Sequence, residues 1–302
     1  MGPVIISKSI RAYLIGIGDI ISFLMVSSVF TAFTSLMMLY FSFIVLGVTP
    51  KPILLCAMFL VIYGVYSLNK VTDRKEDAIN MPVRSTFVSG NERFLLTLAI
   101  ASYTAALLLG LFESPFAASI LLVPFLSGVI YSTNSLSIIG IPRLKDIFLV
   151  KSLIVAFSLA VCAAFLPAIH LHSSAKLYFI FPFFFSKVFI NTVLFDVRDV
   201  GGDSLNGVKT IPVVIGIKRT RQMLLLIQSL LVVWFVLFSD LFSKYYVILI
   251  TSMVYGYLYI LYFCNTKHHS AMSWDILLDG EWISMSIGVW LYLILFSTVG
   301  NT

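Results

Sequence analysis

Three polar residues with metal-binding side chains recur at one spacing just after an apolar run. Asn69, Asp73 and Asp77 are each four residues apart, so a continuing helix would place them in one stripe on successive turns. Two carboxylates on adjacent turns repel each other, and a bound Mg²⁺ would relieve that repulsion because hard cations prefer oxygen ligands. The alternative is a solvated helix end in which Arg74 and Lys75 balance the acidic charge. This segment by itself is consistent with both interpretations.

A second acidic segment favours the metal site. Asp196, Asp199 and Asp203 are three and four residues apart, which is again the spacing of one helical stripe. Two facing clusters of this kind can hold Mg²⁺ ions that bridge to phosphate oxygens. Asp196 is either a further ligand or a general base. Because Gly201 and Gly202 follow Asp199, we expect the chain to bend before Asp203, which would interrupt the stripe.

The composition identifies a membrane protein. The chain has 302 residues, of which 60% are hydrophobic and 11% are charged, and its mean hydropathy is +1.02. A soluble domain carries about 25% charged residues. In such a chain the net charge of +6 reports orientation in the bilayer and does not indicate a nucleic-acid partner. The three cysteines lie far apart inside apolar runs, so they suit neither a zinc site nor a disulfide framework.

The elements that must position the acidic residues are membrane-spanning helices, each of about 20 mainly apolar residues. We predict an all-α membrane protein in which nine transmembrane helices form a bundle around a central cavity, as a single domain over residues 1–302. Residues 4–14 could form a short helix at the membrane surface. The predicted spans are 17–47, 52–68, 94–112, 115–135, 147–168, 176–195, 222–240, 243–264 and 282–298. The first acidic motif, 69–77, follows the second span, and the second, 196–203, follows the sixth.

The basic residues predict the orientation. Most of the 20 lysines and arginines fall at one set of span ends, which the positive-inside rule assigns to the cytoplasm. This places the N-terminus in the cytoplasm. Both acidic motifs lie on that side, so we expect an active site that faces the cytoplasm in a protein of the cell membrane.

Four segments together resemble one family. They are Asn69-x3-Asp73-x3-Asp77 with Asn80-x-Pro82-x-Arg84, then Tyr131-Ser132, then Arg143-Leu144-Lys145, and then Asp199-x3-Asp203-x3-Gly207-x2-Thr210-x-Pro212. These segments look like the two aspartate motifs and the intervening segments of the UbiA superfamily of intramembrane prenyltransferases. The resemblance covers nearly the whole chain. One departure is Lys70, which stands where the family often has aspartate.

The resemblance implies a reaction and roles for the motif residues. A prenyl group, from geranyl to geranylgeranyl, would move from a prenyl diphosphate to a lipophilic acceptor, with release of pyrophosphate. The acceptor would be an aromatic quinone precursor or an archaeal glycerol-ether lipid. Two Mg²⁺ ions would be held by Asp73, Asp77, Asp199 and Asp203, with Asp196 and Tyr131 as further catalytic residues and Asn69, Arg84, Arg143 and Lys145 as contacts of the diphosphate.

Lys187 and Asn191 are unusual because they lie inside the predicted sixth span. They are four residues apart and so share a helix face. An ionisable residue at membrane depth is costly and usually faces the interior of the bundle. We therefore expect both to line the central cavity, near the diphosphate or the acceptor head group. The alternative for Lys187 is a structural ion pair or a side chain that extends to the membrane surface.

Two other function classes remain to be weighed. A transporter or channel whose cytoplasmic acidic residues collect cations should carry ionisable residues at midplane depth in several spans. In the predicted spans such a residue is found only at Lys187, apart from Asp19 near the start of the first span. A scaffold without activity would not need two acidic motifs. The pattern therefore favours an enzyme that acts on a diphosphate, with the lipid bilayer and not nucleic acid as its environment.

Overall fold

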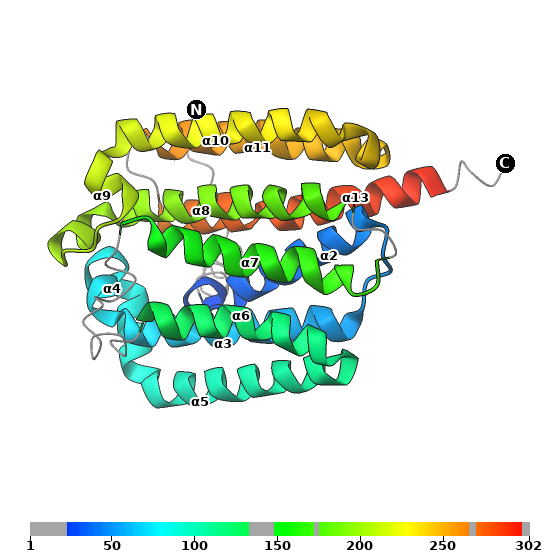
Figure 1. Cartoon of the computed structure of the whole chain (residues 1–302). Coiled ribbons are helices and arrows are strands. Elements are labelled where there is room, and N and C mark those ends of the chain that lie inside the picture. Colours follow the sequence, from blue (N-terminus) through cyan, green and yellow to red (C-terminus); the bar gives the residue numbers. More distant parts are fainter. Residues whose placement is uncertain (1–22, 133–147, 172–174, 266–269, 298–302) are drawn as a thin grey trace, which may run out of the picture.

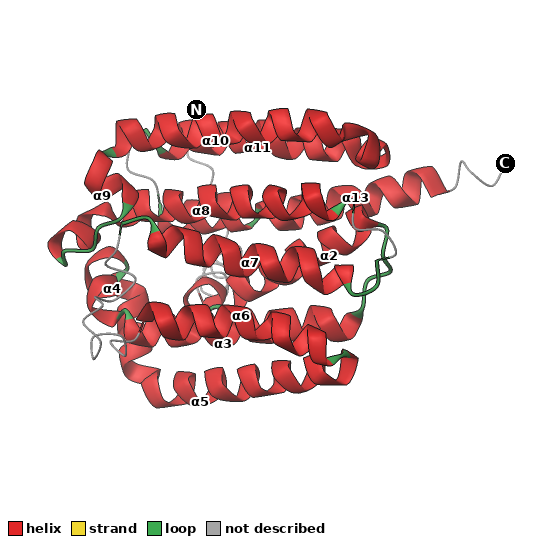
Figure 2. Cartoon of the chain, in the orientation of Figure 1, coloured by secondary structure: helices red, strands yellow, loops and turns green. Residues whose placement is uncertain are grey.

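The computed structural model of the chain describes residues 23–132, 148–171, 175–265 and 270–297. Within these ranges every regular element is a helix and no strand occurs, as Figure 2 shows. The predicted all-α class is therefore confirmed. This architecture suits a bilayer, because a helix satisfies its backbone hydrogen bonds within its own segment.

The long helices follow the predicted spans with shifted boundaries. They are α2 (Val29–Leu46), α3 (Pro52–Thr72), α5 (Pro82–Glu113), α6 (Pro115–Ser132), α7 (Val150–Ala168), α8 (Leu177–Leu205), α10 (Ile217–Phe238), α11 (Tyr246–Phe263) and α13 (Glu281–Ser297). Short elements connect them: α4 (Arg74–Asn80), α9 (Ile211–Ile215), the 3₁₀ helix η3 (Ser239–Tyr245), α12 (Ala271–Trp274) and the π-helix η4 (Asp275–Asp279).

Seven helical stretches of the described residues are long and apolar enough to cross a membrane. One of these stretches, Ile217–Phe263, contains both α10 and α11. The apolar part of α6, Pro115–Gly128, is shorter than these seven stretches. A membrane protein is thus supported by length and composition. The number of nine spans and the cytoplasmic N-terminus stay predictions.

The predicted first span, 17–47, is not one helix. Ser28 has a left-handed backbone conformation with φ of 69°, and α2 begins only at Val29. The Lys70 ammonium donates hydrogen bonds to the carbonyl oxygens of Met25 and Val26, at 3.1 and 2.8 Å. These bonds satisfy backbone groups that the interruption would leave unpaired. Residues 17–22 and the predicted surface helix 4–14 lie outside the described residues.

The helices lie side by side, and the short elements α4 and α9 sit together at one end (Figure 1). Helix α3 packs against α2, α5 and α6, whereas α8 packs against α7 and α10. Helix α4 contacts both α5 and α8. The C-terminal ends of α3 and α8, which carry the two acidic motifs, therefore meet at the same end of the bundle.

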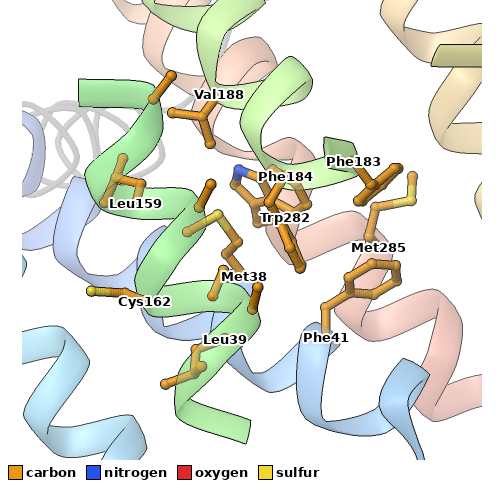
Figure 3. Packing of buried hydrophobic residues seen from close by; sticks show 14 of the residues in the cluster. Met38, Leu39, Phe41, Leu159, Cys162, Phe183, Phe184, Val188, Trp282 and Met285 are labelled. Atoms are coloured by element: carbon orange, nitrogen blue, oxygen red, sulfur yellow. The ribbon is translucent and has the colours of Figure 1, made fainter. Parts of the chain in front are cut away.

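An aromatic core joins α2, α8 and α13 (Figure 3). The ring of Phe184 lies 5.3 Å from that of Trp282 and 6.4 Å from that of Phe41, between centroids. Phe183 and Phe184 are fully buried. Phe183 and Phe184 of α8 therefore fill the interior of the bundle and do not line a channel. Filling the interior is the usual role of buried apolar side chains.

Glycines allow α3 and α5 to approach closely. A Cβ atom at Gly64 would lie 2.9 Å from the backbone oxygen of Ala99. Small residues at such crossings bring helix backbones together in membranes, where van der Waals packing drives association.

We predict that Gly64→Leu destabilises the folded protein by about 1–3 kcal/mol, because the added side chain must push α5 away. The matched control is Gly90→Leu, since no heavy atom lies within 4 Å of a Cβ atom built there. The measurement is the thermal unfolding midpoint of the detergent-solubilised protein. Equal midpoints for the two variants would contradict the packing argument.

Candidate active site

A cavity of about 230 Å³ opens between the helices that carry the acidic motifs. Six carboxylates and four cationic side chains line it, and most of the remaining lining is apolar. Carboxylates are therefore in excess, and four of the six form ion pairs with cationic side chains. The charged lining consists of Lys70, Asp73, Asp77, Arg84, Lys151, Asp196, Arg198, Asp199, Asp275 and Asp279.

The first motif lines this cavity, although its helix is interrupted. We expected one continuing helix, but α3 ends at Thr72 and Asp73 has non-helical angles, with φ of −96° and ψ of 18°. The backbone N–H of Asp73 still donates to the oxygen of Asn69 at 2.8 Å, and that of Asp77 to the oxygen of Asp73 at 3.0 Å. This four-residue ladder preserves the stripe. Asn69, Asp73 and Asp77 all reach the cavity.

Arg84 holds the end of this motif. Its guanidinium forms an ion pair with the carboxylate of Asp77, and both side chains line the cavity. Burial raises the pKa of the Asp77 carboxyl above its ordinary value, while the Arg84 charge opposes that rise. Asp77 is thus a buried carboxylate whose ionisation depends on nearby positive charge.

The second motif lies on an unbroken helix. The prediction of a bend at Gly201 and Gly202 is wrong, because α8 continues through both residues to Leu205. Asp196 and Asp199 line the cavity, whereas Asp203 does not. Asp203 lies one turn further along the helix, where its carboxylate is 3.9 Å from the Lys151 ammonium.

Asp196 has its own partners. Its two oxygens accept hydrogen bonds from the Lys151 ammonium at 2.7 Å and from the Ser152 hydroxyl at 2.9 Å. Asp196 therefore anchors Lys151 at the cavity wall. Arg198, two residues further along the helix, forms a two-pronged ion pair with Asp199, at 2.8 and 2.9 Å.

Gly202 brings the two motifs together. Its backbone N–H donates to the side-chain oxygen of Asn80 at 2.8 Å, which ties the end of α4 to α8. A Cβ atom at position 202 would lie 2.4 Å from that oxygen. The absence of a side chain here permits the close approach, which is a recognised use of glycine.

The sequence reasoning missed a third acidic pair. Asp275 and Asp279 lie on η4, immediately before α13, and both line the cavity. Asp275 accepts a hydrogen bond from Arg198 at 3.4 Å. The available signal was their four-residue spacing, which is the same as that of Asp73 and Asp77.

Lys187 and Asn191 occupy different places. Lys187 forms an ion pair with Glu281 at 2.6 Å, and both side chains are fully buried. The Lys187 ammonium also donates to the backbone oxygen of Ser252 at 3.1 Å. The structure therefore gives Lys187 the structural ion pair that was the alternative, and not a place in the cavity wall. Asn191 lines a smaller adjoining cavity.

Three predicted site residues cannot be placed. Arg143 and Lys145 lie outside the described residues. Tyr131 belongs to the last turn of α6, but its side chain is also outside the description. Their roles stay predictions.

Comparison with known proteins identifies the family. The model of the UbiA prenyltransferase family matches residues 28–275, which include both acidic motifs. The chain belongs to the UbiA prenyltransferase family. The predicted family and enzyme class are thereby confirmed. A search of curated protein sequences gave no match.

Solved structures share the fold of this UbiA family member. A UbiA homologue from Archaeoglobus fulgidus bound to GPP and Mg²⁺ has a TM-score of 0.60 at 16% identity, covering 87% of this chain and 96% of that one. An apo UbiA homologue from Aeropyrum pernix K1 has a TM-score of 0.57 at 13% identity, with coverages of 87% and 97%. A digeranylgeranylglyceryl phosphate synthase has a TM-score of 0.55 at 14% identity, with coverages of 90% and 93%.

The cavity residues of this UbiA family member fit a hard divalent cation. Among the described residues, no three Asp, Glu, His or Cys side chains lie close enough to hold a metal ion as they stand. Arg84, Lys151 and Arg198 form ion pairs with carboxylates of the cavity. The donors themselves are nevertheless oxygen atoms of the kind that Mg²⁺ prefers. The buried side-chain oxygen of Asn69 also has no hydrogen-bond partner in the described part of the chain.

We predict that Gly202→Ala separates the two motifs and weakens binding of a prenyl diphosphate by roughly tenfold or more, because sub-ångström placement of charged contacts decides affinity. Gly201→Ala is the control, since nothing lies within 4 Å of a Cβ atom at Gly201. The measurement is the affinity for geranylgeranyl diphosphate with Mg²⁺. Similar affinities for both variants would show that the Asn80 contact does not set the motif spacing.

We predict that Lys187→Met lowers the free energy of unfolding by about 3–5 kcal/mol, because it leaves the Glu281 charge buried without its partner. The double variant Lys187→Met/Glu281→Gln removes both charges and should recover much of that loss. Thermal unfolding in detergent compares the two. Equal unfolding midpoints for the single and double variants would argue against a coupled pair.

Proposed function

We propose that this protein is a Mg²⁺-dependent intramembrane prenyltransferase, which transfers a prenyl group from a prenyl diphosphate to a lipophilic acceptor and releases pyrophosphate. The observation that carries this proposal is one cavity in which paired carboxylates and cations meet an apolar lining. A diphosphate with a hydrocarbon tail has the same division into charged and apolar parts. The neighbour from Archaeoglobus fulgidus was solved with GPP and Mg²⁺, which supports this substrate class.

The metal would be held by the oxygen ligands of the two motifs. We assign two Mg²⁺ ions to Asn69, Asp73 and Asp77 on one side and Asp199 on the other, all of which line the cavity. Bound Mg²⁺ would neutralise charge that builds up on the diphosphate as the carbon–oxygen bond breaks. Asp203, which was predicted as a fourth carboxylate ligand, lies outside the lining and close to Lys151. It therefore acts in this proposal through Lys151.

The cationic residues would bind the phosphate oxygens. Arg84, Lys151 and Arg198 each line the cavity and each pairs with a carboxylate. A diphosphate offers these side chains a more highly charged partner, which would release carboxylates toward the metal. Arginine contacts phosphate through its planar fork and lysine as a point charge. The predicted contacts Arg143 and Lys145 would add to this set, with Tyr131 near the reacting carbon.

The apolar part of the cavity would hold the prenyl tail and exclude water. Its lining includes Ile62 and Val65 of α3 and Val155 and Leu159 of α7. The ring of Phe195 also lines the cavity, and an aromatic face stabilises a cation. Phe195 is thus suited to the allylic fragment, which carries positive charge once the diphosphate leaves.

The buried Lys187–Glu281 pair does not favour the cation-transport alternative. Such a pathway needs ionisable residues at membrane depth that a passing ion can reach. Lys187 and Glu281 instead neutralise each other and are fully buried. Orientation of the cavity toward the cytoplasm rests on the distribution of lysine and arginine and is part of the proposal.

We predict that Asp73→Asn and Asp199→Asn each lower turnover by roughly 100-fold or more, as expected when one electrostatic contact to a transition state is removed. The assay is Mg²⁺-dependent release of pyrophosphate from labelled geranylgeranyl diphosphate in the presence of a membrane lipid extract. Asp240→Asn is the control, because Asp240 is exposed in η3 between α10 and α11. Release that persists without divalent ions, or that is unchanged in both variants, would overturn the proposal.

A further inference from the structure

A second cavity of about 40 Å³ adjoins the first. The two share part of their walls, including Thr31, Tyr66, Phe195 and Asp279. The lining residues of the smaller cavity come from α2, α3, α7, α8, η4 and the start of α13. A group held here would therefore be connected to a body that occupies the main cavity.

One residue that lines this smaller cavity carries an unpartnered hydrogen-bond acceptor. Asn191 lines it and is only 5% exposed. Its side-chain N–H donates to the backbone oxygen of Leu278 at 3.3 Å, but its side-chain oxygen has no partner in the described part of the chain. A buried acceptor without a donor is costly, so a native structure that keeps one calls for an explanation.

The other polar groups of this cavity also offer acceptors. The hydroxyls of Thr34 and Ser35 donate to the backbone oxygen of Thr31, at 3.0 and 2.9 Å, and that of Thr192 donates to Val188 at 2.9 Å. Their protons are thus engaged within their own helices, while their oxygen lone pairs remain. The carboxyl group of Asp279 also lines this cavity.

The remaining walls are apolar and closely packed. Met38, Leu159, Val188 and Trp282 line the smaller cavity, and Figure 3 shows them converging from α2, α7, α8 and α13. One water needs about 10–15 Å³ of such space. The volume therefore admits a small polar group such as a hydroxyl and its carbon, and not a prenyl tail or a diphosphate.

We infer that this smaller cavity is a subsite for a free hydroxyl group of a neutral acceptor, whose body lies in the main cavity. The hydroxyl would donate to the Asn191 oxygen or to Asp279, which an ether or a carboxylate cannot do. This inference rests on the proposed function and specifies its acceptor class.

The first experiment measures binding without any prenyl donor. Naphthohydroquinone is kept reduced and titrated into the full chain in detergent by calorimetry, in parallel with its dimethyl ether and with naphthalene-1,4-dicarboxylate, in which carboxylates replace both hydroxyls. We expect the ether and the carboxylate to bind roughly tenfold or more weakly, because each leaves the buried acceptors without a donor. Equal binding of the three probes would overturn the inference, as would no binding of any of them, which would mean that the subsite holds water only.

The second experiment changes the subsite. Asn191→Leu should weaken naphthohydroquinone binding by roughly tenfold, and Thr34→Val provides a milder change of the same wall should the first variant not fold. Gln228→Leu is the matched control. Gln228 is likewise buried, donates to the backbone oxygen of Met253 at 2.9 Å and has an unpartnered side-chain oxygen, but it lines neither cavity.

The outcomes separate this inference from the function on which it rests. Selective probe binding that depends on Asn191 and Thr34 supports the hydroxyl subsite, whether or not the protein releases pyrophosphate. If pyrophosphate is not released, that result counts against the prenyltransferase proposal alone. Pyrophosphate release with probe binding that is unchanged in the folded Asn191 and Thr34 variants overturns the subsite alone.

Discussion

The rest of the structure depends on one constraint, which is that positive charge must compensate the carboxylates crowded around the cavity. Six of them line one cavity, and like charges in a partly desolvated space destabilise a fold unless positive charge lies nearby. Arg84, Lys151 and Arg198 provide that charge through ion pairs on different elements. In the proposed function the same three cations would bind the diphosphate. The pairing that stabilises the protein would then also hold these side chains in place for the phosphate oxygens.

Two kinds of ion pair in this molecule show how environment separates structure from function. The Lys187–Glu281 pair is fully buried among helices α8, α11 and α13 and holds the bundle together. The Lys151–Asp196 pair, at almost the same separation, lines the cavity, and in the proposed function Lys151 would exchange this partner for the diphosphate. The difference lies in access, since a charge that no ligand can reach contributes only to the fold.

Sequence reasoning succeeded where the signal is local and failed where it depends on neighbours. Hydropathy located the apolar helices, and the four-residue spacing of Asn69, Asp73 and Asp77 placed them on one stripe. The bend expected at Gly202 did not occur, because the glycine serves a contact with Asn80. Asp275 and Asp279 were overlooked although their spacing was visible, since no apolar helix end adjoined them on the N-terminal side.

The sequence by itself determined the membrane class, the helical fold and the family, because the period of a helix and the length of a span are written in consecutive residues. Only the tertiary structure decided which charges share a cavity. In the tertiary structure Asp203 lies outside the cavity lining, Lys187 pairs with Glu281, and the acidic residues of η4 line the cavity. The tertiary structure also set Asn191 against an adjoining cavity. These contacts join helices that are distant in sequence. They are determined by how the helices pack and not by the spacing of residues along the chain.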